Sequence, residues 1–424
     1  MNILHFICEK DPDGLASRFL RDELEGSGNL MSCKVLTVSG YKGIDAADVD
    51  QDRLSARIWN FRKNEKKFRD IVRSADIDVV HIHSLSSYWG RMVFRWSQKL
   101  CLPVVVSTYK YFMEWNFSYR HTRKMFSLVG GMGRMLDKAT AIHVVNEQEK
   151  SKMSSLSVFH EYKIGERLSE KTVCVSYAKT SDAEMGLPNV ATRMCSLYRK
   201  AVDSNPFWMM TPDDRRIEAN MLQLGAAVAD AEKYGIVVSD DFAKLVDEAY
   251  NLSTERLRRI ILHCSDQGVL HLFVLAMRSR QADYNTFDVA EVQRFVKPQK
   301  IEFLETTRAW IRVSRTKQML ESYPQYATEK KICIMLLNIR HLLNEEKLSL
   351  KNLYDFYNVL RFEDCDEFIL ENMLDEIGMQ GFSARMFYIM HEKMNLSEGF
   401  VPVEMKNDRE TRRILNKLFK SNVL

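Results

Sequence analysis

The chain of 424 residues lacks any run of about 18 apolar residues, the length that a transmembrane helix requires. Its opening residues, MNILHFICEK, form an apolar stretch too short for a secretory signal. The net charge is only +4 at pH 7, without the clustered basic stripe typical of nucleic-acid binding. We therefore expect no membrane span, no export signal and no nucleic-acid partner, although this mild charge permits contact with an anionic membrane face.

Closely spaced cysteine pairs are also absent. The eight cysteines are scattered along the chain, and none stands at a metal-ligand spacing from another. This pattern is typical of buried free thiols in a reducing compartment. We expect a cytoplasmic protein, with peripheral contact at the inner face of the membrane as an alternative, and no metal or cofactor.

Residues 1–183 alternate short apolar runs with amphipathic helices, which is typical of an α/β domain. A helix is expected from Gly14, and another over Leu54–Val72, where apolar residues recur at helical spacing. Repeated βα units predict a Rossmann-like parallel sheet with helices on both faces. The expected strands are Ile3–Cys8, Cys33–Ser39, a run from Asp78, Leu102–Ser107, Ala141–Val145 and Thr172–Ser176.

Residues 184–424 are expected to form a mainly α-helical domain of unknown role, because the strand signal fades there. Thr211-Pro212-Asp213-Asp214 predicts a helix start, with a capping hydroxyl, proline in the first turn and carboxylates near the positive end of the dipole. No fixed period indicates a repeat array. Further helices are predicted from Ser253 and over 299–319, 328–343, 350–360, 367–377 and 410–419.

The turn after the first strand, with Asp13 and Gly14, is one candidate binding position. A glycine there lets backbone N–H groups approach a phosphate or sugar at a helix N-terminus. A tight strand-to-helix turn alone also uses glycine, so both interpretations stay open.

A second candidate is the pair His81 and His83, which alternation along a strand places on one face. A metal site would need further ligands, and the neighbouring sequence offers none at ligand spacing. His83, at the strand end, is instead a candidate cleft-lining donor and a candidate catalytic residue. A structural histidine is the alternative.

Polar residues follow three predicted strands at their carboxyl ends, where parallel sheets bind ligands. Asn146 and Glu147 have a second interpretation, as the cap and first turn of the next helix. Tyr109 is the second catalytic candidate. The candidate cleft residues at the strand ends are His83, Ser84, Thr108, Tyr109, Asn146 and Glu147.

The segment 115–138 interleaves basic and apolar residues. Arg120, Arg123 and Lys124 could meet a membrane surface or an anionic acceptor from such a helix. A solvated helix face is the alternative.

Taken in order, four pieces of the chain resemble the N-terminal domain of family 4, GT-B-fold glycosyltransferases, over about 180 residues. They are the opening strand with its glycine turn, residues 78–83 (DVVHIH), residues 102–107 (LPVVVS), and residues 141–149 (AIHVVNEQE). The resemblance implies metal-independent transfer of a sugar from a nucleotide-sugar co-substrate to a glycan or lipid-linked acceptor, in bacterial-type surface polysaccharide synthesis. In that family the N-terminal domain holds the acceptor, and a second Rossmann-like domain holds the donor.

The chain departs from the family at several positions. Tyr109 stands where the family often has a histidine, and the donor-domain signature of two glutamates eight positions apart is missing. A fragment at Glu184 mimics its start, but Thr192 stands at the position of the second glutamate. Three hypotheses follow. The chain is a glycosyltransferase whose donor site is unconventional or completed by another subunit, or a non-catalytic GT-B-like binding or accessory module whose helical half contacts a protein partner. The third is an unrelated doubly wound protein that binds another phosphate ligand.

Overall fold

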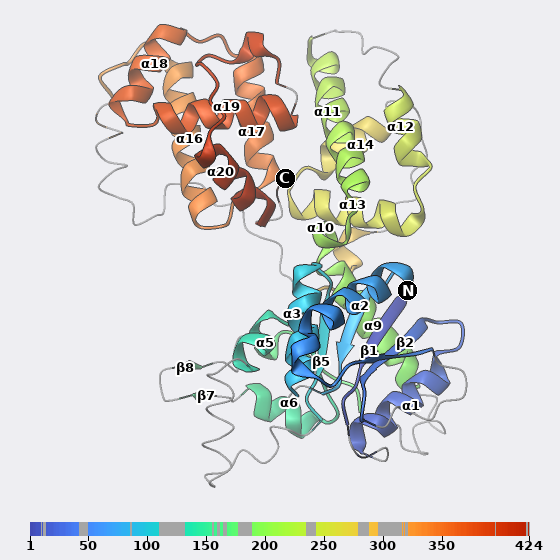
Figure 1. Cartoon of the computed structure of the whole chain (residues 1–424). Coiled ribbons are helices and arrows are strands. Elements are labelled where there is room, and N and C mark those ends of the chain that lie inside the picture. Colours follow the sequence, from blue (N-terminus) through green and yellow to red (C-terminus); the bar gives the residue numbers. More distant parts are fainter. Residues whose placement is uncertain are drawn as a thin grey trace. The chain divides into compact units, whose positions relative to one another are not determined.

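The chain divides into two compact units in the computed structural model (Figure 1). The α/β unit comprises Met1–Met209 and Ala290–Lys297, and the helical unit comprises Met210–Val289 and Pro298–Leu424. The structure describes residues 1–9, 11, 14–41, 50–84, 87–109, 132–154, 157–158, 162–163, 168–176, 189–234, 243–278, 288–295, 316, 318, 321–394, 396–420 and 423.

The α/β unit is built on a seven-stranded, wholly parallel sheet with the order β3-β2-β1-β4-β5-β6-β9. The first six positions of this order match those of a Rossmann-type doubly wound sheet, so the predicted Rossmann-like class is confirmed. Its strands are β1 (Asn2–Phe6), β2 (Ser32–Val38), β3 (Gln51–Leu54), β4 (Val79–Ile82), β5 (Val104–Ser107), β6 (Ala141–Val144) and β9 (Thr172–Cys174). A separate two-stranded hairpin joins β7 (Ser157–Val158) to β8 (Tyr162–Lys163).

Helices cover both faces of this sheet (Figure 1). Phe68 of α2 and Trp96 of α3 belong to the core on one face. Phe19 of α1 and Tyr198 of α9 belong to the core on the other. The helical segments of the unit are α1 (Leu15–Ser27), η1 (Ile58–Asn60), α2 (Phe61–Ser74), α3 (Tyr88–Lys99), α5 (Gly133–Lys138), α6 (Glu147–Ser154), α9 (Val190–Asp203) and α10 (Pro206–Met209).

The two faces of the sheet differ in polarity, because alternate residues of a strand point to opposite sides. The face covered by α2 and α3 is apolar, with residues such as Phe6, Ile82 and Val106. The face under α1 and α9 starts apolar at Ile3 and Val79 but becomes polar toward the carboxyl ends of the strands. Its polar side chains include His5, His81, His83, Ser107 and His143, all buried.

Two sequence expectations need correction. Residues 51–54 form the edge strand β3, so Leu54 belongs to the sheet and the helix begins at Phe61. The compact units separate after Met209 rather than after residue 183, because Val190, Met194 and Leu197 of α9 pack into the core of the sheet.

The described part of the helical unit contains helices and no strand. Thr211 and Asp214 cap α11 reciprocally, as the sequence predicts: the Asp214 N–H donates to Thr211 Oγ1 at 3.1 Å, and the Thr211 N–H donates to Asp214 Oδ2 at 2.8 Å. Residues 296–315, most of the helix expected at 299–319, lie outside the described residues. The helical segments are α11 (Pro212–Tyr234), α12 (Ala243–Tyr250), α13 (Thr254–Asp266), α14 (Leu270–Arg278), α16 (Ala327–Asn344), α17 (Leu350–Phe362), α18 (Glu367–Glu376), α19 (Gln380–Met394), η6 (Glu398–Phe400) and α20 (Arg409–Lys420); η4 (Val289–Glu291) lies at the junction of the two units.

Candidate functional site

The N-terminus of α1 already carries an anion from the chain itself. Oε2 of Glu9 accepts hydrogen bonds from the Ser17 N–H at 3.1 Å and from the Ser17 hydroxyl at 2.9 Å. A Cβ at Gly14 would lie 2.3 Å from Oε1 of Glu9, so glycine is needed there to admit the carboxylate. Glu9 thus takes the position where a helix N-terminus would receive a phosphate. Asp13 lies outside the described residues.

Tyr109 and His83 contact each other at the carboxyl edge of the sheet. The tyrosine hydroxyl lies 2.5 Å from Nδ1 of His83, and the two rings are stacked at 5.8 Å with an interplanar angle of 19°. Tyr109 has a φ of 43°, in the left-handed region that side chains other than glycine rarely adopt. Burial lowers the pKa of His83 and raises the pKa of Tyr109, so both groups are neutral at pH 7.

The other candidate residues at this edge make contacts within the fold. Ser84 Oγ accepts the Cys8 N–H at 2.7 Å, and Thr108 donates its hydroxyl to Glu149 Oε1 at 2.6 Å. Asn146 accepts the Glu149 N–H at 2.7 Å and so caps the start of α6. The Glu147 side chain is 74% exposed and lies 3.9 Å from Lys150. Each of these contacts supports the local fold, and Glu147 faces solvent.

A chain of hydrogen bonds crosses the polar face of the sheet below this edge. His143 Nε2 lies 3.1 Å from the Val175 carbonyl oxygen, and its Nδ1 lies 2.6 Å from Ser107 Oγ. Ser107 Oγ lies 2.7 Å from His81 Nε2. Tyr198 Oη lies 2.6 Å from His81 Nδ1 and 2.5 Å from Glu23 Oε1. All five side chains are buried.

The Val175 carbonyl oxygen at one end of this chain determines which group donates in each hydrogen bond. A carbonyl only accepts, so neutral His143 donates from Nε2 and accepts the Ser107 hydroxyl at Nδ1. Ser107 then accepts from His81 Nε2, and Tyr198 donates to His81 Nδ1. Glu23 completes the chain by donating from its protonated carboxyl group. Burial raises the pKa of Glu23 to about 8, which agrees with this order.

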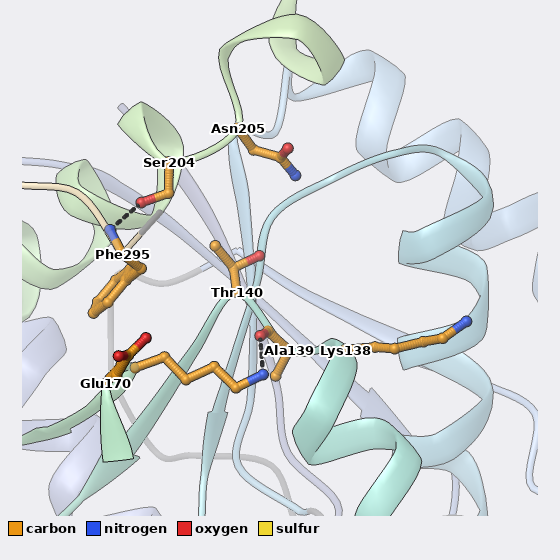
Figure 2. A pocket seen from close by; sticks show the side chains of 8 residues that line it. Lys138, Ala139, Thr140, Glu170, Ser204, Asn205 and Phe295 are labelled. Atoms are coloured by element: carbon orange, nitrogen blue, oxygen red, sulfur yellow. Dashed lines mark hydrogen bonds between the residues drawn. The ribbon is translucent and has the colours of Figure 1, made fainter. Parts of the chain in front are cut away.

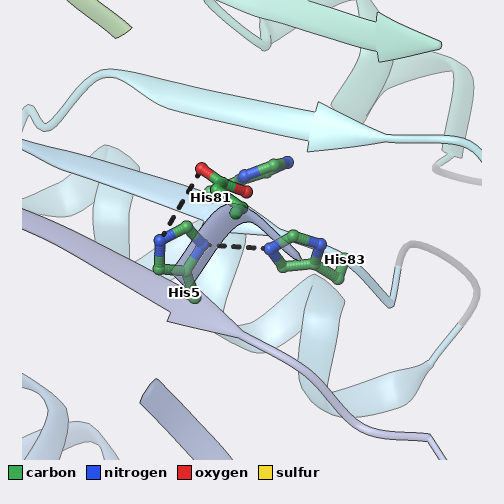
Figure 3. Close-up of side chains that lie close together, drawn as sticks. His5, His81 and His83 are labelled. Atoms are coloured by element: carbon green, nitrogen blue, oxygen red, sulfur yellow. Dashed lines mark hydrogen bonds and ion pairs between the residues drawn. The ribbon is translucent and has the colours of Figure 1, made fainter. Parts of the chain in front are cut away.

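Three histidines and Glu23 converge beside this chain (Figure 3). His81 and His83 share a face, as predicted, with ring centroids 3.9 Å apart. His5 lies opposite His81 in the parallel pairing of β1 with β4, and its Nδ1 lies 3.1 Å from His83 Nε2. One potential ligand atom from each of His5, Glu23, His81 and His83 lies within 4.8 Å of the others, so this cluster could hold a metal ion.

Sequence reasoning missed His5, Glu23, Ser107, His143 and Tyr198. His5 and His143 carried a usable signal, because each stands in a predicted strand at a position that alternation assigns to the face of the other histidines. Glu23 and Tyr198 stand on helices 175 positions apart, and no local pattern relates them.

A pocket of about 280 Å³ lies at the opposite edge of the same sheet (Figure 2). Thr140 and Lys171, which line it, precede β6 and β9, so the pocket is at the amino ends of those strands. The Lys171 ammonium donates to the carbonyl oxygens of Asp137 and Ala139. Because ligands of open α/β sheets bind at the carboxyl ends, we place the candidate site at the other edge.

Arg120, Arg123 and Lys124 lie outside the described residues. Among the helices that the structure describes, none combines the length and apolar character that crossing a membrane requires.

Comparison of the chain with protein-family models, with curated proteins and with solved structures gives no match.

Proposed function

We propose that this chain is a glycosyltransferase-like binding module, whose α/β unit binds a glycan or lipid-linked acceptor without transferring a sugar itself. The observation that carries the proposal is the combination of one seven-stranded parallel sheet with a second unit that is helical throughout its described part. A parallel sheet of this type offers a ligand cleft at its carboxyl edge. A donor domain of the kind that the resemblance implies would require a second sheet.

The Glu9 carboxylate at the N-terminus of α1 favours a ligand that places no phosphate there. A nucleotide diphosphate there would need the Ser17 N–H, which Glu9 already occupies, and would meet the Glu9 carboxylate. Two like charges at one helix end repel each other, so phosphate binding would require Glu9 to leave. A neutral sugar hydroxyl has no such conflict.

The carboxyl edge supplies groups suited to a hydroxylated ligand. Tyr109 is partly exposed and presents an aromatic ring, and Ser84 is partly exposed with a hydroxyl group. Aromatic rings with a few well-placed polar groups are typical of small-ligand sites. In this proposal Tyr109 and Ser84 meet the acceptor, and buried His83 holds the Tyr109 hydroxyl in place.

A catalytic glycosyltransferase is the second candidate, favoured by the close contact of Tyr109 with His83 at the carboxyl edge. In that case a nucleotide sugar is the co-substrate, and the donor site comes from another chain or from residues outside the described ones. Catalysis would then depend on groups that stabilise the charge of the departing diphosphate. Tyr109 would contact the acceptor hydroxyl, and His83 would orient the Tyr109 hydroxyl.

Thermal unfolding with two ligand panels tests the proposal. One panel contains UDP-, GDP- and ADP-sugars, and the other contains oligosaccharides and a prenyl-linked sugar. A ligand at one hundred times its dissociation constant stabilises the fold by about 2.7 kcal/mol. We expect stabilisation by a member of the second panel and none by the first. Stabilisation by a nucleotide sugar together with its turnover would establish the catalytic alternative, and no response to either panel would contradict both.

Two further contacts belong to this proposal. The helical unit would contact a protein partner. Arg120, Arg123 and Lys124 would contact an anionic membrane. Co-sedimentation with anionic liposomes at low salt, compared between the wild type and a triple alanine variant, tests the membrane contact.

A further inference from the structure

We propose that His5, Glu23, His81 and His83 form a binding site for a divalent transition metal, with zinc as the best fit. Three of the ligands stand on the adjacent strands β1 and β4 or directly after β4, and the fourth stands on α1. The relative exposure of these residues is 0%, 0%, 0% and 4%, so the ion would be enclosed by protein. This inference stands on the cluster alone and does not depend on the proposed ligand of the carboxyl edge.

Two of the four ligand residues carry buried polar atoms that lack hydrogen-bond partners in the described part of the chain. Nε2 of His5 and Oε2 of Glu23 make no hydrogen bond within the described part of the chain. His5 Nε2 lies 4.0 Å from Glu23 Oε1, beyond hydrogen-bonding distance (Figure 3). Leaving a buried polar atom unpaired costs about 1–3 kcal/mol, so a positive ion that both atoms bind would remove two such costs.

The other atoms of the ligand residues have the outer contacts typical of metal sites. Metal-binding histidines usually donate their second ring N–H to a neighbouring oxygen, which fixes the orientation of the ring. His81 Nε2 has Ser107 Oγ at 2.7 Å, and His83 Nδ1 has the Tyr109 hydroxyl at 2.5 Å. These contacts leave Nδ1 of His81 and Nε2 of His83 as the metal-binding atoms.

Tyr198 bridges two of the ligand residues, His81 and Glu23. Its hydroxyl lies 2.6 Å from His81 Nδ1 and 2.5 Å from Glu23 Oε1. For an ion to bind Nδ1 of His81, the Tyr198 hydroxyl must move away from this atom and keep only its hydrogen bond to the Glu23 carboxylate. The contact of His5 Nδ1 with His83 Nε2, at 3.1 Å, is lost in this change.

The ligand types and their separation indicate which metals fit. Three imidazoles with one carboxylate favour zinc, and also nickel, copper or iron, over the oxygen-preferring magnesium and calcium. Ligands in tetrahedral zinc sites, with bonds of about 2.0–2.2 Å, lie roughly 3.4 Å apart. The ligand atoms here lie within 4.8 Å of one another, so the cluster contracts when it binds the ion. Glu23 provides most of that movement, since its side chain comes from a helix rather than from the sheet.

Metal binding to the full-length protein tests this proposal. The protein is dialysed against EDTA, loaded with Zn²⁺, desalted and measured by mass spectrometry for bound zinc. We expect about one zinc per chain, and a higher unfolding temperature after loading. Glu23→Gln and His5→Gln should each lower retained zinc to less than a tenth, whereas the matched control His143→Gln, a buried histidine on the same face, should retain it.

Cobalt provides a second measurement that needs no variant. Co²⁺ in a tetrahedral nitrogen and oxygen site absorbs visible light far more strongly than hydrated Co²⁺, and Zn²⁺ should remove this absorption by competition. A folded wild type that retains no zinc overturns the proposal. So does a cobalt spectrum of hydrated type, or zinc retention that is equal in the wild type, Glu23→Gln and His5→Gln.

Discussion

Glu9 places a carboxylate oxygen 3.1 Å from the backbone nitrogen of Ser17, at the first turn of α1. The interaction of a negative group with a helix N-terminus is worth about 0.3–1 kcal/mol, and hydrogen bonds to a charged acceptor add to it. This contact occupies the Ser17 N–H, and a side chain at Gly14 would displace the Glu9 carboxylate from it.

The first prediction concerns the charge of Glu9. Glu9→Gln should lower the free energy of unfolding by about 1 kcal/mol, because the amide keeps an acceptor oxygen but loses the charge. The matched control is Glu25→Gln, an exposed change near the other end of the same helix, where loss of a negative charge should be neutral or slightly stabilising. Urea denaturation followed by circular dichroism measures both. Equal effects of the two variants would contradict the role assigned to Glu9.

The second prediction concerns the hydroxyl of Tyr109. Tyr109→Phe should lower the free energy of unfolding by about 1–3 kcal/mol, because Nδ1 of His83 loses its partner at 2.5 Å. Tyr323→Phe removes an exposed hydroxyl that bonds to Glu376, and should change stability by less than about 0.5 kcal/mol. If the carboxyl edge binds an acceptor, Tyr109→Phe should also weaken binding in calorimetry. Unchanged stability would show that the two side chains do not interact in solution.

The third prediction concerns pH and His143. Burial lowers the pKa of His143 from 6.5 to about 4. Between these values the unfolded chain binds a proton at this position and the folded chain does not, so stability is lost as the pH falls from 6.5 toward 4. One such group contributes up to about 1.4 kcal/mol per pH unit.

His143→Gln should reduce this slope, since glutamine can donate to Val175 and accept from Ser107 but does not titrate. Urea midpoints at several pH values between 4 and 6.5 measure the slope in the wild type and in the variant, both in EDTA. The same slope in both proteins would mean that His143 is not buried in its neutral form.

The fourth prediction concerns the packing of α11 against α14. A Cβ at Gly225 would lie 1.9 Å from the backbone oxygen of Leu272, so Gly225→Ala forces the two helices apart. We expect a loss of about 3 kcal/mol or more, at the upper end for overpacked cores. Gly399→Ala is the control, because among the described residues, its two chain neighbours aside, no atom lies within 4 Å of the added Cβ. In thermal unfolding, the midpoint of Gly225→Ala should lie clearly below that of Gly399→Ala. Similar midpoints would contradict the close approach of α11 to α14.

Much of the sheet could be predicted from sequence, because its central strands are short, mainly apolar runs without the 3–4 spacing of an amphipathic helix. The strands β1, β2, β4, β5, β6 and β9 lie where they were expected. The edge strand β3 was missed, since its four residues, QDRL, include two charges and one apolar side chain at the start of a helical pattern. Tertiary pairing with β2 overrides that weak local signal.

The residues of the candidate site, too, could be predicted only in part from the sequence. The sequence by itself determined that His81 and His83 share a face and that polar residues follow the strands, because both depend on the two-residue repeat of a strand. Only the tertiary structure brought His5, Glu23 and Tyr198 to them, since pairing of β1 with β4 and packing of α1 and α9 on the sheet join residues far apart in the chain. It also decided that Glu9 occupies the helix N-terminus after β1, because the sequence shows the glycine there but not which group lies against it.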